Sequence, residues 1–152
     1  MSKLKRYIPD TCESGIGYKD TSANIFESMM LSNAWLDLTS NQKVLYLCCK
    51  SQKYSQHSIN DEDTKSFYFN RHLWLNKYKL YSASNQRYFY KDMGELILHG
   101  FIKCGKCGAV AKEKNIYQLS DKWQVWDTNL FNLDNSELSM SLLNKKYPNK
   151  KV

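Results

Sequence analysis

Two cysteines in the second half of the chain have the spacing of metal ligands. Cys104 and Cys107 are separated by a Gly-Lys dipeptide and followed by another glycine, so their thiolates would meet at a tight turn. This spacing is typical of one half of a structural zinc site, which needs four ligands. No second Cys-x-x-Cys motif supplies the other half, and Cys12, Cys48 and Cys49 are scattered. We therefore expect no bound metal or other cofactor. An ordinary hairpin turn and a reversible disulfide remain the alternatives for the pair.

A second group of side chains has the chemistry to recognise the edges of nucleotide bases. Asn85 and Gln86 carry amides that can pair bidentately with adenine, and Arg87 carries a guanidinium that can pair with guanine. These residues belong to a polar stretch in which we expect the first turns of a helix. The candidate residues of this stretch are Ser84, Asn85, Gln86, Arg87, Tyr88 and Lys91. The alternative is a polar helix face that simply meets water.

The motifs of common catalytic sites are absent from the sequence. It contains no HExxH motif, no P-loop, no dinucleotide-binding fingerprint and no G-x-S-x-G motif. The three histidines, His57, His72 and His99, are far apart. We therefore expect that the protein is not an enzyme and that a partner would supply any nicking or phosphoryl-transfer chemistry.

The overall composition narrows the class of protein. The chain has 152 residues, of which 42% are hydrophobic and 14% aromatic, which is enough for one domain with a core and too much for a disordered chain. No apolar run is long enough to span a membrane, and the polar start lacks the apolar core of a signal peptide. These features predict a cytoplasmic protein without a membrane partner. The odd number of cysteines argues against a disulfide framework.

The positive charge is concentrated in one part of the chain. The formal net charge is +7, yet residues 1–66 carry eight basic and eight acidic side chains. Residues 67–119 carry nine basic and three acidic side chains, and the same window is rich in tyrosine and phenylalanine. A localised basic and aromatic surface favours nucleic acid as a partner, whereas a solvated surface is the alternative.

The residues before position 70 predict helices followed by a loop. Apolar spacing indicates a short helix from Ile25 to about Leu38. Thr39 and Gln42 fit a capping box, which predicts a helix to about Gln52 with an apolar stripe. The stripe comprises Val44, Leu45 and Cys48, with Tyr46, Leu47 and Cys49 beside it. Residues 53–66 are polar and predict a loop.

The next segment predicts a strand, two helices and a hairpin. We expect a strand at 67–69, a brief helix at 72–78 and a compact turn at 79–82. Ser82 or Ser84 would cap a longer helix that ends at Gly100, with one apolar face. That face comprises Phe89, Met93, Leu96 and Ile97. Two short strands around a Lys-rich turn follow, and we expect Trp123 and Trp126 to pack back on the domain.

The stretch Leu96-Ile97-Leu98-His99-Gly100-Phe101-Ile102 resembles a winged helix-turn-helix protein, in which an apolar helix ends in glycine and leads into a β-hairpin wing. The resemblance covers residues 25–123 and implies an α+β fold of helices with a C-terminal β-hairpin wing. Residues 1–24 lack sustained periodicity and contain Pro9, Gly15 and Gly17, which predicts a flexible N-terminal arm. Over residues 124–152 we expect a C-terminal extension, in which Asn135 or Ser136 caps a short helix with Leu138, Leu142 and Leu143 before a basic tail.

A second similarity rests on scattered short matches. They are Asn33-Ala34-Trp35-Leu36-Asp37-Leu38-Thr39, Val44-Leu45-Tyr46, Asn115-Ile116-Tyr117 and Ser120-Asp121-Lys122-Trp123. They look like small winged-helix proteins of Gram-positive plasmids and conjugative elements, among them replication-initiator-like domains and relaxosome accessory proteins. This similarity implies sequence-specific binding of double-stranded DNA in transfer or replication. It also implies relaxase or replication proteins as partners, and a homodimer.

The resemblance divides the candidate residues between two elements. The helix beginning near Ser84 would enter the major groove, and the hairpin would meet phosphates or the minor groove. The hairpin residues are Lys103, Lys106, Lys112 and Lys114. Whether the helix or the hairpin is the main reader stays open. Three further alternatives are a transcriptional regulator of the same fold, a winged-helix protein-interaction module that does not bind DNA, and a zinc-stabilised hairpin domain.

Overall fold

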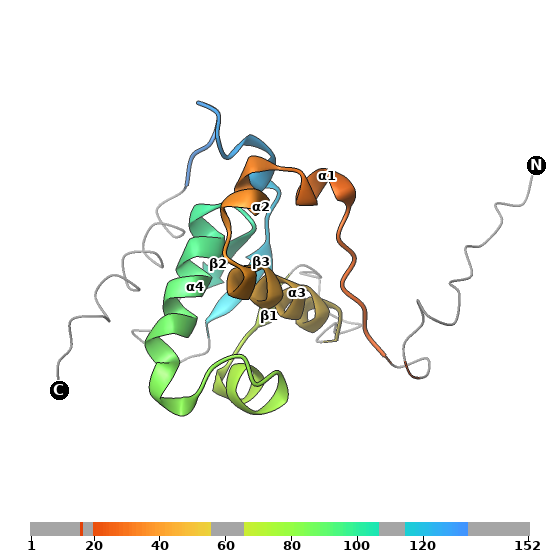
Figure 1. Cartoon of the computed structure of the whole chain (residues 1–152), viewed down its shortest axis with the longest axis vertical. Coiled ribbons are helices and arrows are strands. Elements are labelled where there is room, and N and C mark those ends of the chain that lie inside the picture. Colours follow the sequence, from red (N-terminus) through yellow and green to blue (C-terminus); the bar gives the residue numbers. More distant parts are fainter. Residues whose placement is uncertain (1–15, 17–19, 56–65, 107–114, 134–152) are drawn as a thin grey trace, which may run out of the picture.

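The chain forms a mixed α+β structure in which helices pack against a small antiparallel sheet (Figure 1). The structure is a computed structural model, and it describes residue 16 and residues 20–55, 66–106 and 115–133. The helices are α1 (Glu27–Met30), α2 (Asn33–Asp37), α3 (Ser40–Ser55), the π-helix η1 (His72–Lys77), the 3₁₀ helix η2 (Ala83–Asn85), α4 (Gln86–Leu98) and the 3₁₀ helix η3 (Lys122–Val125). The strands are β1 (Ser66–Tyr68), β2 (Ile102–Lys106) and β3 (Ile116–Leu119).

The segment predicted as one helix up to Leu38 forms two short helices instead. Ser32 separates α1 from α2, because its hydroxyl donates to the carbonyl of Met29 at 2.6 Å and accepts from the amide of Trp35 at 3.2 Å. Serine competes with the helical hydrogen bonds in this way, and here it ends one helix and caps the next. The prediction of a continuous helix was therefore wrong at this serine.

The capping box at the start of α3 is confirmed. The amide of Thr39 donates to Oε1 of Gln42 at 2.9 Å, and the amide of Gln42 donates to the Thr39 hydroxyl at 3.3 Å. The helix extends to Ser55, three residues beyond the predicted end. Its buried face holds Leu45, Tyr46 and Cys49. Val44 is exposed, so the predicted stripe is rotated relative to the observed buried face.

The three strands form an antiparallel sheet in the order β1-β3-β2. Tyr117 on the central strand lies opposite Phe67 on β1 and Cys104 on β2, and all three side chains are buried. Helix α3 packs against β1, and α4 packs against β2. The predicted hairpin is confirmed for its two strands, whereas its turn, residues 107–114, lies outside the described residues. The predicted strand at 67–69 is observed one residue earlier.

The predicted brief helix at 72–78 forms with π geometry. The amide of Tyr78 donates to the carbonyl of Leu73 at 2.9 Å, five residues back, and Lys79 adopts a positive φ of 52° where the chain then turns. As predicted, the helix buries Leu73 and Trp74. The Trp74 ring stacks on Phe89 of α4 at a centroid distance of 5.4 Å, which fixes α4 against this turn.

Helix α4 begins differently from the prediction but buries the predicted face. Neither Ser82 nor Ser84 caps it, because η2 precedes the helix and the two hydroxyls lie 3.1 Å from each other. The predicted apolar face is confirmed by the burial of Phe89, Met93, Leu96 and Ile97.

Gly100 ends α4 in the left-handed conformation that the sequence predicts. Its φ is +79°, its amide donates to Ile97, and the amide of Phe101 donates to Leu96, which together form a Schellman motif. The carbonyl of Gly100 then accepts from the amide of Trp123 at 3.0 Å. The prediction that both tryptophans pack on the domain is confirmed. Trp123 stacks on Phe101, and Trp126 stacks on His99.

Two further predictions concern the two ends of the chain and the presence of membrane-spanning helices. Most of the N-terminal arm, the predicted last helix with Leu138, Leu142 and Leu143, and the basic tail lie outside the described residues. Among the described ranges, no helix has the length and the apolar character needed to cross a membrane.

Replacement of Gly100 by alanine tests the turn that joins α4 to β2. A Cβ at this position would lie 2.6 Å from backbone atoms of Lys122 and Trp123, and the positive φ of Gly100 would also strain an alanine. We expect Gly100→Ala to lower the free energy of unfolding by roughly 3 kcal/mol in a urea titration. Gly105→Ala is the matched control, because its Cβ would meet the Gln118 side chain at an ordinary 3.6 Å. Equal losses in both variants would contradict this explanation.

Candidate nucleic-acid interface

Six of the predicted site residues lie together on an exposed surface at the start of α4. Helix η2 and the first turns of α4 position them, because the opposite side of α4 packs on the core through Phe89 and Met93. The exposed residues are Ser84, Asn85, Gln86, Arg87, Tyr88 and Lys91. We call these six residues the α4 face. It combines amide, hydroxyl, phenol and cationic groups that all reach solvent.

The charges along α4 run opposite to the order that a helix dipole favours. The basic residues Arg87 and Lys91 lie in the N-terminal half, and the acidic residues Asp92 and Glu95 lie toward the C-terminal end. The first turn contains no acidic residue and the last turn no basic one. Each misplaced charge near a helix terminus costs about 0.3–1 kcal/mol in an exposed helix. Helix stability therefore does not account for the cations at this end.

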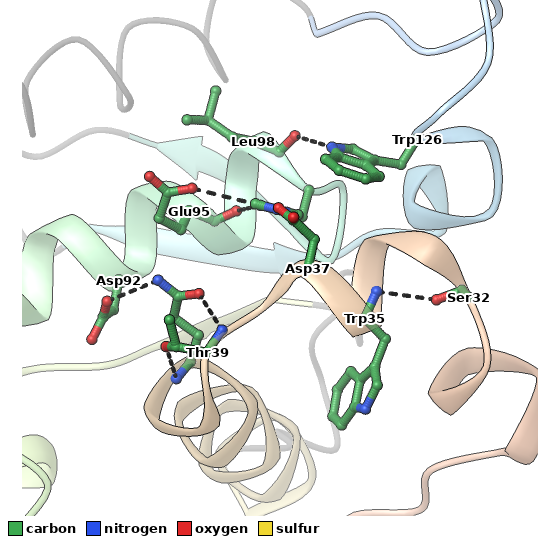
Figure 2. A network of polar contacts seen from close by, with 10 residues as sticks. Ser32, Trp35, Asp37, Thr39, Asp92, Glu95, Leu98 and Trp126 are labelled. Atoms are coloured by element: carbon green, nitrogen blue, oxygen red, sulfur yellow. Dashed lines mark hydrogen bonds and ion pairs between the residues drawn. The ribbon is translucent and has the colours of Figure 1, made fainter.

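Both acidic residues of α4 are engaged by neighbouring side chains (Figure 2). The carboxylate of Asp92 accepts from Nε2 of Gln42 at 3.1 Å and from the Tyr81 hydroxyl at 2.6 Å. Oε2 of Glu95 lies 3.7 Å from Nδ1 of His99. Both carboxylates are thus directed to partners on other parts of the structure or at the C-terminal end of α4, and the first turn of the helix contains no acidic residue.

Arg87 and Tyr88 form a pair on the α4 face. The guanidinium lies 4.8 Å from the centre of the Tyr88 ring, and Nη2 donates to the Tyr88 hydroxyl at 3.0 Å. Next to this pair, Nε2 of Gln86 donates at 3.4 Å to the hydroxyl of Tyr90, which lies one helical turn further along α4. A guanidinium has five N–H donors, so the contact with Tyr88 leaves Arg87 further donors for an anionic or base-edge acceptor.

A hydrogen-bonded network holds α4 against α3 and the turn after η1. The buried Gln42 links the two helices, because its Oε1 completes the capping box with Thr39 and its Nε2 donates to Asp92. Burial, and then the hydrogen bond to Asp92, raise the pKa of Tyr81 well above its usual value, so its hydroxyl remains a donor. The sequence identified Gln42 only as a capping residue, and no local signal pairs it with Asp92.

A second polar cluster lies at the C-terminal end of α4 (Figure 2). The buried ring of His99 places Nδ1 2.7 Å from the carbonyl oxygen of Glu95 and Nε2 2.7 Å from Oδ2 of Asp37. Both partner atoms are hydrogen-bond acceptors, so the ring links the end of α4 to α2. Trp126 stacks on this ring at 4.7 Å and donates from Nε1 to the Leu98 carbonyl at 3.1 Å. The cluster joins α2 and the segment after β3 to α4.

The predicted hairpin lysines are only partly described. Lys103 is half-buried on β2, opposite Gln118 of β3 and on the side of the sheet away from Cys104. Lys106 ends β2, and its side chain lies outside the described part of the structure, as do Lys112 and Lys114. Of the hairpin set, Lys103 is the residue whose side chain the described part of the structure places.

Three further basic residues lie on the elements that lead into α4. Arg71, Lys77 and Lys79 are exposed at the ends of η1 and in the turn that follows. The Arg71 guanidinium lies 5.6 Å from the Trp74 ring, and Nζ of Lys77 lies 5.3 Å from the Tyr78 ring. The candidate set taken from the sequence omits them, although the local charge excess in residues 67–119 is the signal that points to them.

The described cysteines have the environment of structural thiols. Cys49 and Cys104 are buried and Cys48 is half-buried. Burial raises the pKa of Cys48 to about 11 and the pKa of Cys49 well above its usual value. In the described parts of the chain, no three or more His, Cys, Asp or Glu side chains form a group that could hold a metal ion. Cys107 lies outside these parts, so the zinc hypothesis for the hairpin stays a hypothesis.

Comparison of the chain with protein-family models, with curated proteins and with solved structures gave no match.

Removal of the Asp92 carboxylate tests the network that positions α4. We expect Asp92→Ala to lower the free energy of unfolding by about 1–3 kcal/mol, because the Gln42 and Tyr81 donors lose their shared acceptor. Urea titration followed by circular dichroism measures the change. Lys91→Ala, on the neighbouring exposed position, is the control and should change stability by less than about 0.5 kcal/mol. A loss no larger than that of the control would show that the network contributes nothing.

The raised pKa of Cys48 gives a pH dependence of thiol labelling. At pH 8 roughly one Cys48 in a thousand is a thiolate, so iodoacetamide should label the native protein slowly at this position. The rate should rise about tenfold per pH unit up to the pKa of about 11. Tandem mass spectrometry separates Cys48 from Cys49, and urea-unfolded protein is the control. A native rate that levels off near pH 8.5 would contradict the assignment.

Proposed function

We propose that the protein is a winged helix-turn-helix protein that binds double-stranded DNA in a sequence-specific manner. The observation that carries this proposal is the α4 face. Its cationic and amide side chains cluster near the N-terminal end of α4, and the helix dipole favours the binding of anions at that end. A helix that carries its positive charge there, at a cost to its own stability, fits a negatively charged ligand. Departures of this kind from local preference are expected at functional sites.

The arrangement of the elements supports the winged-helix proposal. Along the chain, α3, β1, η1, α4 and the β2–β3 hairpin follow one another in the order that the resemblance implies. Strand β1 pairs with β3 on the side away from β2, so the hairpin joins a three-stranded sheet beside α4. In this arrangement one helix face and one hairpin can meet the same ligand.

The α4 face would enter the major groove. An α-helix with its side chains is about 10–12 Å across, which matches a major groove about 12 Å wide. Arg87 would pair with guanine, and Asn85 or Gln86 with adenine. Lys91 and the hydroxyl of Ser84 would contact base edges or phosphates nearby. Tyr88 would hold the Arg87 guanidinium in place, as it does without DNA.

The basic residues outside α4 would contribute affinity rather than specificity. Lys103, Lys106, Lys112 and Lys114 of the hairpin would contact phosphates, and such contacts weaken as salt rises. Arg71, Lys77 and Lys79 would contact the backbone on the other side of α4. Substitutions in the element that recognises the bases, α4 or the hairpin, should change the preferred DNA sequence and not only the affinity.

The biological process follows from the similarity to proteins of plasmids and conjugative elements. We propose that the protein acts in DNA transfer or replication, as a relaxosome or initiator accessory that positions a relaxase or replication proteins. Homodimers would fit a repeated target site. Transcriptional regulation by the same mode of binding is the alternative. A protein-interaction module is the second candidate, favoured by the exposed apolar residues Phe26, Leu31 and Leu36 on the N-terminal helices.

Selection from random duplex DNA at about 150 mM salt tests the proposal, because non-specific phosphate binding is weak there. We expect the wild-type protein to enrich a defined motif. Arg87→Glu combined with Lys91→Glu should lower affinity for that motif at least a hundredfold. The double variant should stay within about 1 kcal/mol of the wild type in stability, because a glutamate at position 87 suits the helix dipole whereas a glutamate at position 91 repels its i,i+4 neighbours. Loss of binding without loss of stability excludes misfolding as the cause.

The matched control carries the same change of charge at two lysines outside the candidate residues. Lys150→Glu combined with Lys151→Glu should retain the motif, with affinity within about tenfold of the wild type. A wild-type protein that enriches no motif, or a double variant on α4 that binds as well as the wild type, would contradict the proposal and favour the protein-interaction module.

A further inference from the structure

Four large apolar side chains are exposed along the two N-terminal helices and their caps. Phe26, Met30, Leu31 and Leu36 are 70%, 43%, 69% and 61% exposed. We call these four residues the α1–α2 surface. Single exposed apolar residues are common in proteins, whereas a concentration of this kind marks an interaction site.

The α1–α2 surface is not needed to attach its helices to the core. Helices of four and five residues are too short to be stable alone, so packing must hold them. The buried residues Met29, Ala34 and Leu38 provide that packing, and they alternate with the exposed ones along the chain. The exposed side chains are therefore left without a role in the described structure.

The sequence of this region is locally acidic. Residues 20–42 contain three acidic side chains and no lysine or arginine, in a chain of net charge +7, while Lys43 and Lys50 of α3 contact the region at the Trp35 ring and the Asn24 carbonyl. Glu27 is exposed on α1, and Asp37 is exposed on α2 beside the ring of His99. The ligand that fits such a surface is apolar and basic.

The described chain ends beside α2. The side-chain amide of Asn33 on α2 donates to the carboxylate of Asp127, and His99 bridges Asp37 of α2 to the stacked ring of Trp126. Figure 1 shows the last described segment, drawn in blue, next to α2. Leu133 is its last residue, and 19 residues follow it in the sequence.

We propose that the segment 136–146 of the same molecule docks on the α1–α2 surface. This segment lies outside the described residues, and its sequence has the complementary character. It carries Leu138, Leu142 and Leu143 and ends in Lys145 and Lys146. The leucines would cover the exposed apolar side chains, and the lysines would face the acidic residues. The proposal does not rest on DNA binding.

The connection in the chain favours docking within one molecule. Only two residues separate Leu133 from Ser136, so the segment is present at a high effective concentration beside α2. A symmetric contact between two α1–α2 surfaces would bring their acidic residues together instead, which opposes association.

Hydroxyl-radical footprinting of the full-length protein tests the proposal through Met30 and Phe26. Leu138→Asp combined with Leu142→Asp should raise the oxidation rate of both residues at least threefold, whereas Tyr88 on α4 should keep its rate. Ser139→Asp combined with Ser141→Asp adds the same two charges without removing an apolar side chain and should leave all three rates unchanged. Conversely, Leu36→Asp on α2 should raise oxidation of the peptide that contains Leu142.

The outcomes that would overturn the proposal are equally defined. Equal oxidation of Met30 in the wild type and the leucine variant, or an equal rise in the serine control, would show that the segment does not cover this surface. Sedimentation analysis should give the same mass for the wild type and the leucine variant at the footprinting concentration. A dimer that dissociates in the leucine variant would overturn docking within one molecule, because the segment would then come from a second copy.

Discussion

The backbone at Gly100 is the constraint on which the arrangement of the other elements depends. A left-handed residue there ends α4 and directs the chain into β2, which places Phe101 in the core directly after the helix. The same position lies against the backbone of Lys122 and Trp123, so no side chain fits. The end of α4, the start of the hairpin and the segment after β3 therefore meet at one residue. The Schellman hydrogen bonds and the Trp123 amide satisfy the polar groups that this close approach buries.

The features that depend on neighbours in the sequence were predictable, whereas those that depend on distant partners were not. The capping box of α3 and the glycine end of α4 involve residues at most a few positions apart, and both were predicted. The apolar spacing of α4 also gave its buried face. The pairing of Gln42 with Asp92, and of His99 with Asp37, joins residues on different helices, and nothing in their local sequence indicates it.

The incorrect predictions have local physical causes. At Ser32 and at Ser82, serine hydroxyls had more than one available partner, and the structure uses a partner that the pattern did not favour. The apolar stripe on α3 was misassigned because Val44 is apolar but exposed, whereas the neighbouring residues Leu45 and Tyr46 are buried. For the candidate interface, the exposed grouping of six residues on α4 followed from helical spacing, and the charge excess of residues 67–119 pointed to Arg71, Lys77 and Lys79.

The pairing of β1 with β3 determines the order in which the molecule can assemble. Phe67 and Tyr117 are partners in the sheet although α4 and the whole of β2 lie between them in sequence. Contacts between residues so far apart form slowly, because a long chain must close before they stabilise anything. The helices and the β2–β3 hairpin are comparatively local, so we expect them to form before β1 joins the sheet. A chain at that stage would expose the edge of β3 to pairing with neighbouring molecules.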